Sequence, residues 1–137
     1  MAFTSKDVME LRQRTGVGMM DCKKALVATD GDMEAAIDFL REKGMATAAK
    51  KEARIAAEGI VYAASKNGKS VLLEVNCESD FVAGGPVFKE YVGKVAEYIL
   101  DNAPASVEDV VAAMQSVTNE YVMKMGEKLS IRRYTVY

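Results

Sequence analysis

The apolar residues of the first 45 positions recur at helical spacing and predict three short helices that pack into a bundle. The first helix begins near Thr4, because Thr4 and Asp7 have the spacing of a capping box. The third begins at Asp32, a suitable N-cap, and is expected to end at Gly44. The expected core positions are Val8, Leu11 and Thr15 in the first helix, Cys22, Ala25 and Leu26 in the second, and Met33, Ala36, Ile37 and Leu40 in the third. A bundle this small buries little apolar surface and is marginal on its own.

Residues 46–58 are rich in Ala, Lys and Glu, which are strong helix formers, and they offer few apolar side chains to bury. This composition predicts a helical connector that is solvated on most sides. The chain is therefore expected to divide into a three-helix module at 1–45, the connector at 46–58, and a second domain at 59–137.

The second domain begins with a β-hairpin. An Asn-Gly pair at positions 67 and 68 lies between two apolar runs, which is the strongest short-range signal for a hairpin. On its second strand Val71, Leu73 and Val75 alternate with Leu72 and Glu74, so one face of the strand is expected to be buried.

Helices follow the hairpin, and a strand ends the sequence. Pro86 suits the first turn of a helix, Ser106 can cap another, and a further helical stretch reaches Gly126. The apolar stripe expected on the first of these helices is Val87, Tyr91, Val95, Tyr98 and Ile99. Residues 128–136 alternate as a third strand. Because strands and helices occur in separate runs, the predicted fold class is α+β, with a small antiparallel sheet after the three-helix bundle.

The composition argues against several classes of protein. Half of the residues are hydrophobic and 28% are charged, as in folded soluble proteins. The net charge of −2 lacks the basic excess of nucleic-acid binders, so no direct nucleic-acid partner is expected. No apolar run approaches the roughly 20 residues that a membrane helix needs, and the N-terminus has no signal-peptide core. A cytoplasmic protein is expected, and an organellar protein without its transit peptide would look the same.

The sequence offers no catalytic or metal-binding constellation. It has no histidine, the commonest general base and metal ligand, and no glycine motif for nucleotides or cofactors. Cys22 and Cys77 lack a base that would activate a thiol, and both are expected to fill core positions. Glu78 and Asp80 alone are too few ligands for tight metal binding. We therefore expect neither an enzyme nor a cofactor.

Two segments carry side chains that suit either a core or a partner. Met19 and Met20 point about 100° apart on a helix, so one is expected to be buried and the other to be partly exposed, at the rim of the bundle or against a partner. Phe81 lies beside Asp80 in the predicted loop 77–86. It either covers the core or anchors a partner. From the residues alone, the core position is favoured in both segments.

Three segments resemble the elongation factor Ts family. RTGVGMMDCKKAL at residues 14–26 is a long match to the family's first signature, near the start of the chain where the family carries it. LEVNCESDFVA at residues 73–83 is similar to the second signature, with Ser79 where the family usually has Thr. GEKLSIRR at residues 126–133 is also similar to the family. The three segments occur in the family's order.

The resemblance implies an N-terminal module of the ubiquitin-associated type and a core α+β domain. It also implies a guanine-nucleotide exchange factor for elongation factor Tu. Asp80 and Phe81 match family residues that insert beside the Mg²⁺ site of the partner's GTPase domain, and Val82 adjoins them in the predicted site. Displacing the cation from its oxygen ligands weakens the hold on the phosphates, and GDP leaves.

The same resemblance assigns partner contacts to the N-terminal module. Its residues that match the family's contacts with elongation factor Tu are Leu11, Arg12, Met19 and Met20. The resemblance thus favours partner binding over the core position for both the methionine pair and Phe81.

The chain departs from the family pattern in two respects. Met9 stands where the family often has Lys. The family also usually continues into a second core subdomain, whereas this sequence stops at Tyr137, so a truncated or short form is expected. An uncovered apolar strand at the edge of the sheet would then favour a homodimer through the α+β domain.

An adaptor is the alternative hypothesis. In it, the three-helix module binds a protein partner and the α+β domain only dimerises. The segment Asp80-Phe81 discriminates the two hypotheses, because an adaptor has no need of it.

Overall fold

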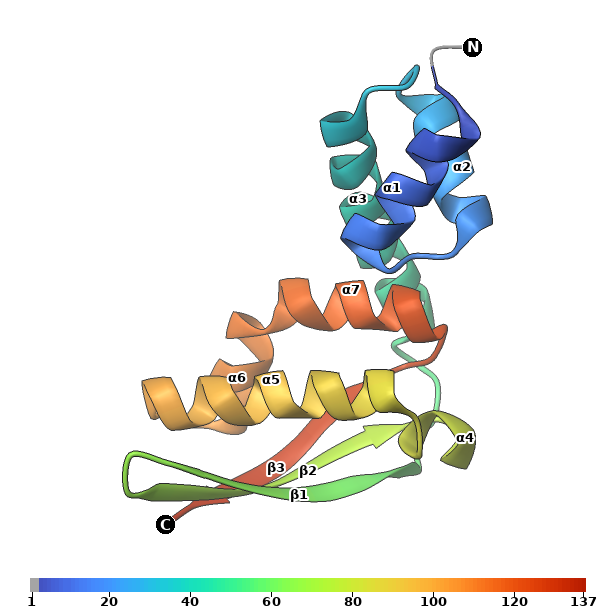
Figure 1. Cartoon of the computed structure of the whole chain (residues 1–137). Coiled ribbons are helices and arrows are strands. Elements are labelled where there is room, and N and C mark those ends of the chain that lie inside the picture. Colours follow the sequence, from blue (N-terminus) through green and yellow to red (C-terminus); the bar gives the residue numbers. More distant parts are fainter. Residues whose placement is uncertain (1–2) are drawn as a thin grey trace.

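The computed structural model describes residues 3–137, which form a three-helix module, a layer of helices and a three-stranded sheet (Figure 1). The elements in chain order are α1 (Ser5–Thr15), α2 (Met19–Ala28), α3 (Met33–Lys51), β1 (Glu58–Lys66), β2 (Lys69–Cys77), α4 (Asp80–Ala83), α5 (Pro86–Asn102), α6 (Val107–Ala113), α7 (Gln115–Met125) and β3 (Ser130–Val136). The predicted α+β class, with helices first and a small antiparallel sheet after them, is confirmed.

The sheet is antiparallel in the order β1-β2-β3. The predicted hairpin is confirmed: Lys66 pairs with Lys69, and both turn residues adopt the left-handed region, with φ of 53° at Asn67 and 79° at Gly68. That backbone suits the twist of the flanking strands. The register between β2 and β3 shifts at Glu74/Val75, where a bulge interrupts the pairing.

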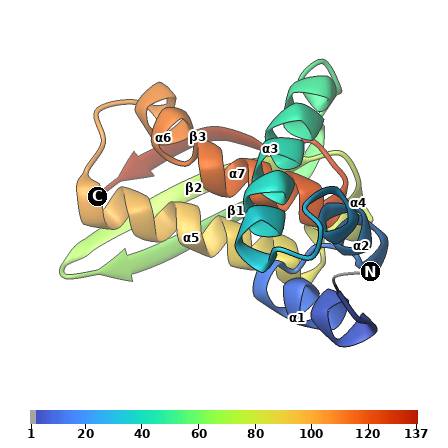
Figure 2. The same cartoon turned by 90° about the horizontal axis from the view of Figure 1, so that it is seen from above.

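Helix α5 lies on one face of the sheet and forms the main core with it (Figures 1 and 2). As predicted, Val71, Leu73 and Val75 are buried. The predicted apolar stripe on α5 is wrong at one position, because Val87 is exposed and Phe88 is buried instead. The other buried positions of α5 are Tyr91, Val92, Val95, Ala96, Ile99 and Leu100.

The three-helix module has its own hydrophobic cluster. The Thr4 N–H donates to the Asp7 carboxylate at 2.9 Å, which is one half of the predicted capping box. Asp32 caps α3 by accepting from the N–H of Ala35 at 3.1 Å. The buried members of this cluster are Val8, Leu11, Val17, Cys22, Ala25, Leu26, Ala36 and Leu40.

Gly44 does not end the third helix, as the sequence predicted; α3 continues through it to Lys51. Glycine occurs at this position because of helix packing: a Cβ at Gly44 would lie 3.2 Å from the carbonyl oxygen of Asn119 on α7. Glycine therefore allows α3 and α7 to approach closely. The first part of the predicted connector belongs to this helix, and its Ala48 packs against the main core.

The second face of the sheet carries apolar side chains that are open to solvent. Val61 and Ala63 of β1 lie on this face with Leu72 of β2, which pairs with Ala63. Val61 is 65% exposed. An ion pair between Glu74 and Arg133, 2.7 Å apart, crosses the same face from β2 to β3. We call Val61, Ala63 and Leu72 the outer sheet patch.

Candidate partner-binding site

The segment after β2 forms a short helix, α4, where the sequence predicted a loop. Ser79 is its N-cap, and the Ser79 hydroxyl oxygen accepts a hydrogen bond from the N–H of Val82 at 3.3 Å. We call Asp80–Ala83 the tip. It projects from the end of the sheet at which β2 finishes (Figure 1).

The tip presents Phe81 to solvent and anchors itself through its other apolar residues. Phe81 is 87% exposed, the most exposed of the large hydrophobic side chains that the structure describes. Asp80 is exposed beside it, whereas Val82 is half-buried against the main core and Ala83 is buried. The alternative in which Phe81 covers the core is therefore wrong.

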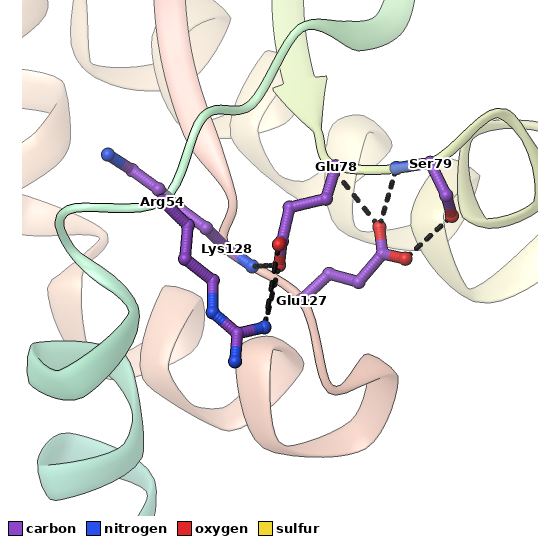
Figure 3. Close-up of polar contacts among 5 residues, drawn as sticks. All are labelled: Arg54, Glu78, Ser79, Glu127 and Lys128. Atoms are coloured by element: carbon purple, nitrogen blue, oxygen red, sulfur yellow. Dashed lines mark hydrogen bonds and ion pairs between the residues drawn. The ribbon is translucent and has the colours of Figure 1, made fainter.

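The carboxylate of Glu127 holds the start of the tip (Figure 3). Its Oε1 accepts hydrogen bonds from the N–H groups of Glu78 and Ser79, at 3.1 and 3.0 Å. Its Oε2 accepts from the Ser79 hydroxyl at 2.6 Å. Because all three donors belong to the two residues that precede α4, this one side chain fixes where the short helix begins.

Glu78 makes the reciprocal contact. Its Oε2 accepts the N–H of Lys128 at 2.7 Å, and its Oε1 lies 3.4 Å from the guanidinium of Arg54 (Figure 3). The Lys128 ammonium group also donates to the carbonyl oxygen of Glu52. We call the two carboxylates, Glu78 and Glu127, with these bonded groups the carboxylate clamp. It joins the segment after α3, the start of the tip and the approach to β3.

In the module, three of the four predicted contact residues are at the surface. Arg12 is exposed on α1, and Met19 and Met20 are 40% and 67% exposed at the start of α2. Leu11 is fully buried in the module's cluster, so its side chain supports the fold and is not open to a partner. The expectation that one of the two methionines is buried is also wrong, because the core side of α2 is filled by Cys22, Ala25 and Leu26.

The two surfaces lie on the same side of the molecule. In both views α1, α2 and α4 are on the side away from the hairpin turn and α6, and in Figure 1 the module lies above α4 (Figures 1 and 2). Helix α3 connects the module to the main core, and Met123 of α7 packs against the module's cluster. A partner that meets one surface is thus well placed to meet the other.

A cleft of about 500 Å³ lies between the module and α6–α7. Its lining includes Ile37, Leu40 and Met45 from α3 and Met123 from α7. It does not include the tip, so the exposed aromatic side chain is separate from this cleft.

Neither thiol is poised for chemistry. Burial, and to a smaller extent the nearby Glu127 carboxylate, raises the pKa of Cys77 to about 11, against a hydrogen bond from the thiol to the Ser79 carbonyl. Burial likewise raises the pKa of Cys22, opposed by its contact with Thr15. Within residues 3–137 no three side chains of the types His, Cys, Asp and Glu cluster as metal ligands, and no helix is long and apolar enough to cross a membrane.

Sequence reasoning placed Asp80, Phe81 and Val82 in one segment but missed the residue that holds them. Glu127 lies 48 positions from Ser79, and no spacing rule connects the two. The resemblance of GEKLSIRR to the family was the only signal at this position, and it assigned the glutamate no role.

The described residues thus present an exposed aromatic side chain on a short helix that the carboxylate clamp holds, an arrangement typical of a protein-binding surface. The family model described as Elongation factor TS matches residues 78–137. Residues 78–137 are therefore similar to an elongation factor Ts domain, which agrees with the resemblance inferred from the sequence and suggests a role in translation elongation. The match begins at the clamp residue Glu78 and includes the tip and β3, whereas the motif at 14–26 lies outside it.

The burial of the thiols predicts slow modification in the folded chain. At pH 8 about one Cys77 side chain in a thousand is ionised, against about one in four for an unperturbed cysteine, and the thiolate is the reactive form. A disulfide reagent should therefore react slowly with the native protein and should titrate two thiols after denaturation with urea. Rapid reaction of one thiol per chain in the native protein would contradict the burial of both cysteines.

Proposed function

We propose that the chain is a guanine-nucleotide exchange factor that binds elongation factor Tu and promotes the release of GDP. In this proposal Phe81 inserts beside the Mg²⁺ site of the partner's GTPase domain, with Asp80 next to it, and the nucleotide phosphates lose part of their coordination. The module, proposed to be of the ubiquitin-associated type, adds contacts through Arg12, Met19 and Met20. The chain would act in the cytoplasm, where its partner works.

The exposure of Phe81 is the observation that carries the proposal. Leaving an aromatic side chain 87% exposed forgoes the roughly 2 kcal/mol or more that its burial contributes. The residues around it do not compensate, because Asp80 is also exposed and Val82 turns inward. An aromatic anchor recovers this free energy when it enters a pocket on a partner, which is the usual behaviour of interface hot spots.

The position of the module supports a two-point contact. Two weak surfaces on one rigid support bind a common partner more tightly than either does alone, because the second contact forms without a further loss of translational freedom. The adaptor hypothesis uses the module surface equally well but leaves the exposed tip without a purpose.

Replacing Phe81 with alanine tests the site. Phe81→Ala should weaken binding to elongation factor Tu by about 2 kcal/mol or more, as loss of an aromatic anchor does. It should slow the release of a fluorescent GDP analogue and leave the melting temperature nearly unchanged, since the side chain is exposed. Val111→Ala, which shortens an exposed apolar side chain on α6, is the matched control and should change neither binding nor release. Normal release by Phe81→Ala would overturn the insertion mechanism.

Thermodynamic linkage separates an exchange factor from a plain binder. A factor that weakens the binding of GDP must itself be weakened by GDP to the same extent. Calorimetric titration should therefore give at least about fivefold tighter binding to nucleotide-free than to GDP-loaded elongation factor Tu, the lower end of typical coupling. Equal affinities for the two forms would leave the chain a binding protein without exchange activity.

The outer sheet patch supports a second property, self-association through the α+β domain. Val61, Ala63 and Leu72 are apolar and exposed on a face that no other described element covers. Pairing two such faces around a twofold axis would bury them.

Introducing a charge into the outer sheet patch tests self-association. The chain is expected to sediment as a dimer at micromolar concentration, and Val61→Glu to sediment as a monomer, because a carboxylate would be desolvated in the contact. Val111→Glu places the same charge on α6 and should leave the dimer intact. A parent chain that stays monomeric throughout the concentration series would refute this part of the proposal.

A further inference from the structure

We propose that Glu127 is a positioning residue for nucleotide release, which holds the tip in the orientation that Phe81 needs to enter the partner. This inference rests on the proposed exchange function and adds a residue that never touches the nucleotide. Its basis is the carboxylate clamp, in which Glu127 bonds the two residues that precede the tip and Glu78 bonds Lys128, the residue that follows Glu127 (Figure 3).

The tip cannot hold its own orientation. A helix of four residues closes barely one turn, and isolated helices this short are unstable in water. Its direction therefore depends on how its first residues are fixed. The Ser79 hydroxyl caps α4 by accepting from Val82, and the same hydroxyl donates to Glu127. Glu127 thus fixes the rotamer of the capping residue as well as the backbone N–H groups of Glu78 and Ser79.

The backbone delivers Glu127 to this position. Gly126 adopts the left-handed region, with φ of 74°, where it ends α7 and turns the chain toward β3. The next residue, Glu127, faces Glu78 and Ser79, and Lys128 presents its N–H to the Glu78 carboxylate. Each segment supplies one carboxylate to the backbone N–H groups of the other. Hydrogen bonds to a charged acceptor contribute more than neutral ones, so this exchange is a strong local constraint.

The clamp also reaches the segment that leaves the module. Arg54 pairs with Glu78, and the Lys128 ammonium group donates to the Glu52 carbonyl. Both residues lie just beyond the end of α3 at Lys51. The orientation of the tip is therefore set relative to the end of α3, the helix that connects the module to the main core.

Amide hydrogen exchange in the free chain tests whether Glu127 holds the tip. In Glu127→Ala the amides of residues 78–82 should exchange at least about tenfold faster, the factor that corresponds to one lost hydrogen bond to a charged group. Amides of α5 should keep their protection. Glu127→Gln retains an oxygen that can accept both N–H bonds and should restore most of the protection. Unchanged exchange at residues 78–82 in a folded Glu127→Ala variant would overturn the inference.

Stimulated GDP release supplies the functional measurement. With full-length variants and elongation factor Tu, Glu127→Ala should lower the maximal release rate about tenfold, again the value of one such hydrogen bond. The half-saturating concentration should rise less, because the module contacts remain. Glu127→Gln should recover most of the rate. Glu97→Ala removes an exposed carboxylate on α5 that pairs with Lys66, and it is the matched control with an unchanged rate.

Parallel measurement of Phe81→Ala distinguishes failure of the positioning role of Glu127 from failure of the proposed exchange function. If Phe81→Ala slows release and Glu127→Ala does not, the positioning role is wrong and the exchange function stands. If Phe81→Ala releases GDP normally, the exchange function is wrong, and hydrogen exchange still decides whether Glu127 holds the tip. Should Glu127→Ala fail to fold, Ser79→Ala removes only the hydroxyl contacts, and its exchange and release rates decide in its place.

Discussion

Helix α7 contributes side chains to both hydrophobic clusters, and the arrangement of the chain depends on this shared packing. Tyr121 and Val122 are buried in the core of the sheet domain, and the next residue, Met123, packs against the core of the module. Each core is small, and small cores bury too little surface to be stable by a wide margin. Sharing α7 lets the two support each other, and the turn after α7 then places Glu127 against the tip.

How far the sequence predicts this structure depends on the range of each interaction. The hairpin at Asn67, the cap at Asp32 and the buried face of β2 follow from neighbouring residues, and all three were predicted. The prediction that Gly44 ends a helix was wrong. Glycine is needed there because the carbonyl oxygen of Asn119, far along the chain, leaves little room for a side chain. The identity of the tip was predicted, but its helical form was not, because that depends on Glu127 and Ser79 meeting in space.

A preorganised tip also explains how so small a protrusion could act on a partner. Ordering a flexible loop on binding costs free energy that is subtracted from the affinity, so an anchor that is already ordered retains more of its contact energy. Here the ordering is supplied during folding by Ser79 and the two clamp carboxylates. The exposed Phe81 can then be solvated in the free chain without losing its direction.

The continuous helix α3 sets the rotation and the distance between the module and the sheet domain. Its 19 residues make a rod about 28 Å long. Within such a rod, each inserted or deleted residue turns everything beyond it by about 100° and shifts it by about 1.5 Å. A single insertion between the module core and Gly44 would swing Met20 away from the side of the molecule that carries Phe81. Insertions or deletions in α3 are therefore tolerable only if they add or remove close to a whole number of helical turns. The length of this helix thus fixes the relative orientation of the two parts that it connects.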